Sequence, residues 1–175
     1  GKDENDVYKI LGIQYIQPEM REDRGEIEAA RENALPRLVE LSDIKGDLHV
    51  HTKRSDGSHT LEELIEAARE RGYEYIAITD HSKGLRVARG LNEERLMEEK
   101  KEIDALNKKL TGFKLLAGIE VDIRSDGRMD FDDDILSKMD IVVASIHFGF
   151  RQSKEQLTKR LVSAMKNPYV SIIAH

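Results

Sequence analysis

The sequence predicts an α/β domain built on a parallel sheet. After about residue 45, short apolar runs alternate with segments of helical periodicity, in the order strand, helix, strand, helix. Because crossover helices join parallel strands, this order indicates a parallel sheet, either open or barrel-like. Histidines or a glutamate follow the strands one after another. The carboxyl-terminal ends of parallel strands are where ligands bind, so we expect one functional edge.

Five strands and four helices are predicted from this alternation. The strands are expected at 47–52, 75–79, 113–121, 141–146 and 169–174. The helices are expected at 61–71, 92–110, 132–137 and 154–166. Thr60 followed by Glu63 predicts a capping box at the start of the first helix, and Gly72 is placed to end it.

The first 43 residues lack this alternation. They contain a small apolar patch between residues 7 and 16, a predicted helix at 25–34 and a predicted helical turn at 37–41. We therefore expect two parts, a linker or the end of a preceding domain at 1–43 and the α/β domain at 44–175. The chain starts at Gly1 and stops on an apolar strand at His175, which suggests a piece of a longer protein.

Composition excludes several functional classes. There is no cysteine, so disulfides, thiolate zinc sites and cysteine nucleophiles are excluded. A net charge of -6 argues against a free-standing, sequence-independent nucleic-acid binder but is compatible with a metal-dependent enzyme that acts on phosphates. No apolar run reaches the roughly 18 residues of a membrane span, and no secretory signal is visible. We expect a cytoplasmic location and no membrane partner.

Metal-binding side chains follow the predicted strands. Five of the six histidines and one glutamate stand at strand ends: His49, His51, His81, Glu120, His147 and His175. Asp56 lies in the turn after His51 and is expected to fold back over the same edge. Imidazoles with carboxylates suit zinc, manganese or iron better than calcium or magnesium alone. The joint placement predicts a metal site.

Ordinary roles remain open for each residue taken singly. The His49–His51 pair can be a hydrogen-bonded surface pair, and His147 can be a core histidine with a satisfied ring. Alternation along the first strand places Asp47 on the face of these two histidines, with Leu48 and Val50 toward the helices. His59 is expected to be an exposed loop residue, and the acidic run 130–134 a solvated loop and helix N-terminus.

Several short motifs resemble the PHP (polymerase and histidinol phosphatase) domain. In chain order they are GDLHVHT at 46–52, SDG at 55–57, TDHS at 79–82, GIEVD at 118–122, ASIH at 144–147 and AH at 174–175. The segment 79–90, TDHSKGLRVARG, resembles the PHP domain fused to bacterial and archaeal family X DNA polymerases. The segment 6–15 is similar to the last stretch of the polymerase thumb, and the segments 15–22 and 25–30 are similar to the junction between the polymerase core and that domain, so 1–43 would be the end of the thumb region and a linker.

This resemblance implies a fold and a set of metal ligands. The family fold is a distorted barrel of about seven βα units, of which this chain would hold about five, with an N-terminal helical linker. One metal would take His49, His51 and Glu120, a second Glu120, His147 and His175, and a third Asp56 and His81. The family pattern adds an Asp and a His beyond residue 175, so we expect up to three Mn²⁺ or Zn²⁺ ions at partial occupancy.

The same resemblance implies a phosphoesterase. Clustered divalent metals activate water and bind phosphate oxygens, and Glu120, Asp56 and His81 would be the central catalytic residues. In family X polymerases the implied activity is a 3′-5′ exonuclease, with related 3′-phosphatase or abasic-site activity, on DNA 3′ ends. By itself, this chain would be weakly active or inactive.

Five rim cations and two rival functions complete the prediction. The cations would hold substrate phosphates or be ordinary solvated side chains: Lys53, Arg54, Lys83, Arg86 and Arg89. A histidinol-phosphate-type phosphatase and a non-catalytic, metal-stabilised structural module of a polymerase remain as alternatives.

Overall fold

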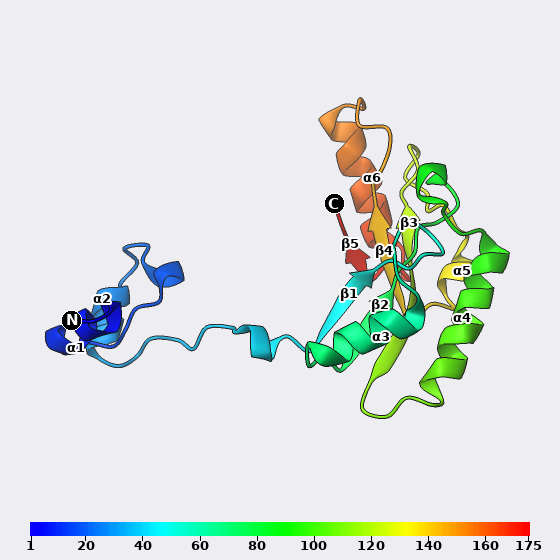
Figure 1. The fold of residues 1–175 in the computed structure, drawn as a ribbon. Coiled ribbons are helices and arrows are strands. Elements are labelled where there is room, and N and C mark those ends of the chain that lie inside the picture. Colours follow the sequence, from blue (N-terminus) through cyan, green and yellow to red (C-terminus); the bar gives the residue numbers. More distant parts are fainter. The chain divides into compact units, whose positions relative to one another are not determined.

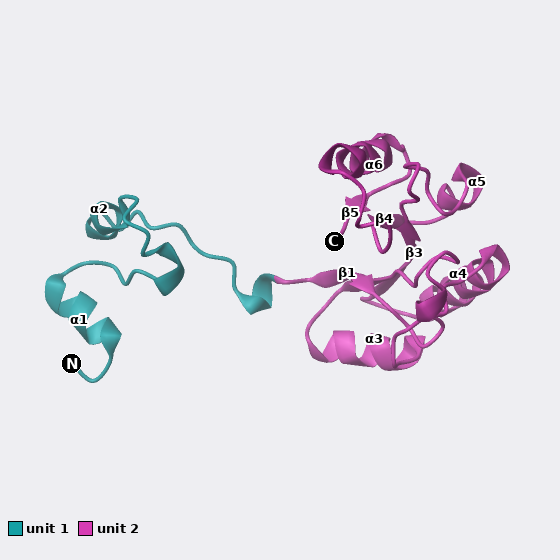
Figure 2. Ribbon diagram, turned by 90° about the horizontal axis from the view of Figure 1, so that it is seen from above, with its two compact units in different colours: residues 1–43 teal, residues 44–175 magenta.

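The chain forms two compact units. The computed structural model describes all 175 residues and divides them into Gly1–Asp43 and Ile44–His175 (Figure 2). The first unit holds only short helices: α1 (Glu4–Leu11), η1 (Pro18–Met20), α2 (Glu26–Arg31) and η2 (Leu41–Asp43). No helix of either unit is long and apolar enough to cross a membrane.

Two features of the first unit differ from the sequence prediction. Helix α1 was not predicted; Asp3 caps its start, and Gly12 ends it in the left-handed conformation with φ 68°. The helical turn predicted at 37–41 is wrong, because the turn begins at Leu41. The Asp43 carboxylate accepts the backbone N–H of Glu40 and pairs with Arg37, which favours a turn closed on residue 43.

The second unit is the predicted α/β domain. Its five parallel strands stand in chain order across the sheet: β1 (Gly46–Val50), β2 (Tyr75–Ile78), β3 (Lys114–Asp122), β4 (Ile141–Ser145) and β5 (Ile172–Ile173) (Figure 1). The helices between them are α3 (Leu61–Glu70), η3 (Arg86–Ala88), α4 (Glu93–Asn107), α5 (Asp133–Leu136) and α6 (Lys154–Lys166). The predicted fold class is confirmed: an α/β fold with five parallel strands in a curled half-barrel.

The predicted capping box is present at the start of α3. The Thr60 hydroxyl accepts the backbone N–H of Glu63 at 3.3 Å, and the Glu63 carboxylate accepts the backbone N–H of Thr60 at 2.8 Å. Gly72 follows the helix in the left-handed region with φ 75°, where a side chain would be strained. These local signals set where the first crossover starts and stops.

Strand β3 separates the apolar core from the polar edge. Its alternation places Leu115, Ala117, Ile119 and Val121 in the two buried apolar clusters under the helices. Glu120, between two of these residues, lies on the opposite face and is nevertheless only 1% exposed. A carboxylate buried this deeply needs compensating partners.

Strand β1 carries a bulge that corrects one prediction. The pairing with β2 shifts between Asp47 and Val50, where three steps on β1 match two on β2. The extra residue puts Asp47 beside Val50 in the cavity against α3, and not on the face of His49 and His51. Val50 packs against the apolar cluster as expected, whereas Leu48 stays 37% exposed.

Candidate metal centre

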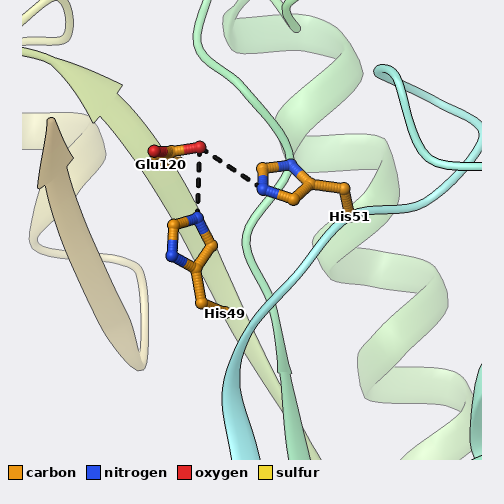
Figure 3. A group of neighbouring side chains, drawn as sticks. All are labelled: His49, His51 and Glu120. Carbon is orange, nitrogen blue, oxygen red and sulfur yellow. Dashed lines mark ion pairs between the residues drawn. The ribbon is translucent and has the colours of Figure 1, made fainter. Parts of the chain in front are cut away.

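Glu120 lies at the centre of the histidine cluster. Its Oε2 is 3.1 Å from Nε2 of His49, 3.3 Å from Nε2 of His51 and 3.0 Å from Nδ1 of His81 (Figure 3 shows the first two). Its Oε1 is 3.3 Å from Nε2 of His147 and 3.6 Å from Nε2 of His175. All five strand-end histidines therefore meet at one carboxylate, as the parallel topology leads one to expect.

Asp56 adds a second carboxylate on the outer side of this cluster. Its oxygens lie 3.7 Å from Nδ1 of His51 and 3.4 Å from Nε2 of His81. The turn that carries it folds tightly onto the end of β1, where a Cβ on Gly57 would lie 2.3 Å from the carbonyl oxygen of His51. Only glycine permits that approach, so Gly57 helps to hold Asp56 at the site.

The geometry fits bound metal ions. Buried atoms without a hydrogen-bond partner gather here: His51 Nδ1, His81 Nδ1, Glu120 Oε2, Asp122 Oδ2 and His147 Nε2. Buried polar atoms normally have partners. Three imidazole nitrogens around one carboxylate oxygen at 3.0–3.3 Å cannot all donate hydrogen bonds to it. Such spacing is what ligands of one ion show, since donors about 2.1 Å from a metal lie about 3.0–3.4 Å apart.

Three overlapping groups have donor atoms close enough to hold a metal ion. They are His49, His51 and Glu120; His51, Asp56 and His81; and His81, Glu120 and His147. His175 approaches Glu120 but remains 72% exposed at its side chain. The groups share members with the three sites that the family resemblance implies, and they differ in assigning His147 beside His81.

Two neighbours orient the central ligands, and sequence reasoning did not single them out. The Ser145 hydroxyl donates to Glu120 Oε1 at 2.6 Å. The Asp122 carboxylate lies 2.7 Å from Nδ1 of His147, which leaves Nε2 facing Glu120. Carboxylate partners of this kind fix the tautomer of a metal-binding histidine. Asp122 stands two residues after Glu120 on β3, and this shared face and its place in the motif GIEVD were the sequence signals for it.

Burial and neighbouring charges compete in setting the pKa values of this cluster. Burial disfavours the ionised form of Glu120, but the Ser145 hydroxyl and the imidazoles of His81 and His49 outweigh it, so its pKa is lowered. Burial lowers the pKa of His81, and this effect outweighs the negative charge of Glu120, which raises it. Burial raises the pKa of Asp122. At His81 these effects favour neutral imidazole beside the central carboxylate, the protonation state that binds metals.

Asp80 holds the loop that carries Asp56, and the sequence analysis did not single it out. It is fully buried and accepts the backbone N–H of Thr52 at 2.7 Å, the Thr52 hydroxyl at 2.5 Å and the Ser55 hydroxyl at 2.5 Å. These bonds tie the turn that carries Asp56 to the end of β2. Glu99 of α4 faces Asp80; burial first, then the Asp80 charge, raises the pKa of Glu99 to about 9.

The predicted phosphate-binding cations divide into two groups. Arg54 pairs with Glu102 and Glu99, and Lys83 pairs with Glu93 and lies over the Phe131 ring at 5.0 Å. The structure therefore engages these two within the chain. The remaining three are exposed and stay predictions: Lys53, Arg86 and Arg89.

The remaining predictions near this edge are settled by burial. His59 is exposed, as expected. The prediction of a fully solvated acidic run at 130–134 is wrong for its first residue. Asp130 is only 5% exposed, because it accepts the backbone N–H of Gly84 at 2.6 Å and pairs with Arg124 at 2.8 Å.

Comparisons with known proteins identify a family and several relatives of this chain. The family model described as "PHP domain" matches residues 47–174. The chain is 48% identical over 172 residues to "DNA polymerase/3'-5' exonuclease PolX" of Bacillus subtilis, covering 98% of this chain and 30% of that protein. It is 38% identical over 136 residues to a probable phosphatase of Caldanaerobacter subterraneus, covering 74% of this chain and 50% of that protein.

A solved structure resembles the chain more distantly. It is the histidinol phosphate phosphatase of Lactococcus lactis complexed with zinc, L-histidinol and phosphate, with 19% identity and a TM-score of 0.47. The match covers 75% of this chain and 57% of that chain. The family assignment instead rests on the match of the family model to residues 47–174, a range that contains Glu120 and every histidine of the cluster except His175. The chain belongs to the PHP domain family.

Proposed function

We propose that the chain is a metal-dependent phosphoesterase domain that hydrolyses DNA 3′ ends. The observation that carries this proposal is the convergence of five histidines on the buried carboxylate of Glu120. Divalent ions held there supply charge neutralisation at phosphate oxygens and water activation near neutral pH. The relatives found include a protein named as a polymerase and 3′-5′ exonuclease and a probable phosphatase. Both names include a phosphoester hydrolase, which favours phosphoester hydrolysis here.

The chain's own residues would divide the work in this way. Glu120, His49, His51, His81 and His147 hold the metal ions, Asp122 keeps His147 in the correct tautomer, and Asp56 closes the outer side. His175 adds a weaker, exposed ligand. In hydrolysis the P–O3′ bond breaks, the oxygen of water joins phosphorus, and the proton ends on the released 3′ oxygen. Mn²⁺ is the ion we expect to support this reaction best, at incomplete occupancy in this chain.

The choice of DNA 3′ ends rests on similarity over nearly the whole chain. The match to the Bacillus subtilis protein named as a polymerase and exonuclease spans both units, whereas the probable phosphatase matches about three quarters of the chain. Because the chain spans 30% of the former protein, any role inside a polymerase is part of the proposal.

A direct assay separates the proposed function from its rivals. The Mn²⁺-loaded chain is given a 5′-labelled single-stranded oligonucleotide and, separately, histidinol phosphate, with Glu120→Gln as the inactive control. We expect stepwise shortening of the oligonucleotide. Preferential release of phosphate from histidinol phosphate would support the small-molecule phosphatase. Metal binding with hydrolysis of neither would support the structural module.

A further inference from the structure

A cavity beside the metal centre is not used by the proposed chemistry. It has a volume of about 550 Å³, and we call it the rim pocket. Its lining residues come from three neighbouring loops: Gly84, Arg124, Ser125, Asp126, Asp130 and Phe148. A volume of this size is in the usual range for small-molecule sites.

One wall of the rim pocket lies near the metal-binding side chains, since a Cβ on Gly84 would be 2.9 Å from Oδ2 of Asp122, whose other oxygen contacts His147. Phe148 follows His147 in the chain, Gly84 comes three residues after His81, and Arg124 comes four residues after Glu120. Each lining loop therefore starts from one of the central residues of the cluster. A molecule whose phosphate lay on the metal centre would extend the rest of its structure toward these loops.

Buried hydrogen bonds hold the walls of the rim pocket at a fixed spacing. Arg160 of α6 is 2% exposed and donates to the carbonyl oxygens of Ile123 at 2.5 Å and Phe148 at 3.0 Å. Its guanidinium also lies 5.6 Å from the centre of the Phe148 ring. Gln152 donates to the Ser125 carbonyl oxygen at 3.1 Å, which joins the same two loops a second time. The pocket is thus formed before any ligand arrives.

Arg124 is the one cation that lines the rim pocket, and its unused N–H donors are available to an anionic group of a ligand. Asp130 is neutralised by Arg124 through two bonds of 3.1 and 2.8 Å, and Asp126 pairs with Arg128 at 2.8 Å. No carboxylate is therefore left alone to receive the ammonium group of an amine. Arg124 keeps 45% of its side chain exposed, and three of its five N–H donors are not used on Asp130. The Phe148 ring supplies an apolar wall.

We propose that the rim pocket binds the terminal nucleoside of the substrate, with the base against Phe148 and Arg124 near its phosphate. This inference rests on the proposed function and names the part of the substrate that the pocket reads. Stacking on an aromatic side chain accepts any base, because every base has a π-face. The pocket therefore gives preference for nucleotides over other phosphoesters without sequence specificity.

Binding of two small probes tests the pocket apart from catalysis. Thymidine 5′-monophosphate and 2-deoxyribose 5-phosphate, which lacks the base, are titrated calorimetrically into the Mn²⁺-loaded chain. We expect the nucleotide to bind about 10-fold more tightly, in line with one base–aromatic contact. Phe148→Leu should bring the two affinities within about twofold, and Phe148→Tyr should keep the difference. Equal affinities of the two probes for the unchanged chain would overturn the proposal.

A matched control and the oligonucleotide assay separate this inference from the proposed function. Phe150, two residues further on, is 68% exposed and does not line the pocket, so Phe150→Leu should leave the affinity ratio unchanged. A ratio that falls as far with Phe150→Leu as with Phe148→Leu would contradict the assigned site. If the probes behave as expected but no oligonucleotide is shortened, the pocket stands and the exonuclease proposal fails. If the oligonucleotide is shortened but the nucleotide binds no more tightly than 2-deoxyribose 5-phosphate, only the proposal for the rim pocket is contradicted.

Discussion

His49 and His175 stack with their ring planes 4° apart and their centroids 6.3 Å apart, although they come from the two edge strands of the sheet. The sheet order places β1 at one edge and β5 at the other, so only strong curling brings these strand ends together (Figure 1). Each ring approaches a different oxygen of Glu120, at 3.1 and 3.6 Å. Glu120 is therefore the point across which the two edges meet.

Metal should stabilise the folded chain. A ligand present at about 100 times its dissociation constant adds about 2.7 kcal/mol to the free energy of unfolding when it binds only the native state. For a domain of this size that corresponds to a rise in Tm of about 5–10 °C. Thermal melts followed by circular dichroism, with Mn²⁺ and then with excess EDTA, check this. An unchanged Tm up to millimolar Mn²⁺ would show that the cluster holds no metal.

Glu120→Gln should abolish most metal binding. The amide keeps the shape of the side chain but removes the negative charge on which five imidazoles converge. Loss of a supporting partner alone costs about 10- to 100-fold, so we expect Mn²⁺ affinity to fall by at least about 100-fold. Calorimetric titration measures it, with the exposed Glu66→Gln on α3 as the matched control. Affinity within threefold of the unchanged chain would remove Glu120 from the centre of the site.

Asp122→Asn should weaken metal binding through His147. The carboxylate lies 2.7 Å from Nδ1 and sets which nitrogen of the ring faces the site. Replacing it with a neutral amide should lower Mn²⁺ affinity by about 10- to 100-fold. The ¹⁵N chemical shifts of the His147 ring, read by NMR in metal-free protein, should report a changed tautomer. Asp134→Asn, at an exposed position, is the control, and equal losses in both variants would speak against a positioning role.

Glu99 should make the domain less stable as pH rises. Burial raises the pKa of Glu99 to about 9, above its usual value of 4.5, so between these values the folded state holds a proton that the unfolded state has lost. Stability is then full below about pH 4.5 and falls with rising pH by up to about 1.4 kcal/mol per pH unit until the folded pKa is passed. Glu99→Gln should flatten this slope.

Urea unfolding at pH 5.5, 7 and 8.5 checks the Glu99 prediction. Glu98→Gln on the same helix, at an exposed position, should retain the slope of the unchanged chain. Parallel slopes in the Glu99→Gln and unchanged chains would mean that Glu99 titrates normally.

The sequence was informative where topology alone decides position. Parallel strands end at one edge of the sheet, so the sequence alone predicted that the five strand-end histidines and Glu120 lie close together. Their ligation of metal stays a prediction. The supporting residues were missed because their role depends on contacts across strands: Asp80 reaches back to Thr52, and Arg160 reaches from α6 to two loops.

Two local features could not be predicted from the periodicity of apolar residues in the sequence. The bulge in β1 adds one residue to the pairing and moves Asp47 to the other face, and neither glycine nor proline stands between Asp47 and Val50 to mark the shift. Asp130 belongs to an acidic run that looks solvated, but Arg124 and the backbone of Gly84 compensate its burial. In both cases the decisive partner lies on a different strand or loop, which amphipathic patterns do not encode.

The gathering of donors from both edges of the sheet around Glu120 has a kinetic consequence. Residues from position 49 to position 175 must all be in place before the donors meet, so the site forms only when every crossover is complete. Contacts absent from the folding transition state change the unfolding rate and leave the folding rate alone. Bound metal should therefore lower the unfolding rate. The metal-free chain should be cleaved by proteases much sooner, while its folding rate stays the same.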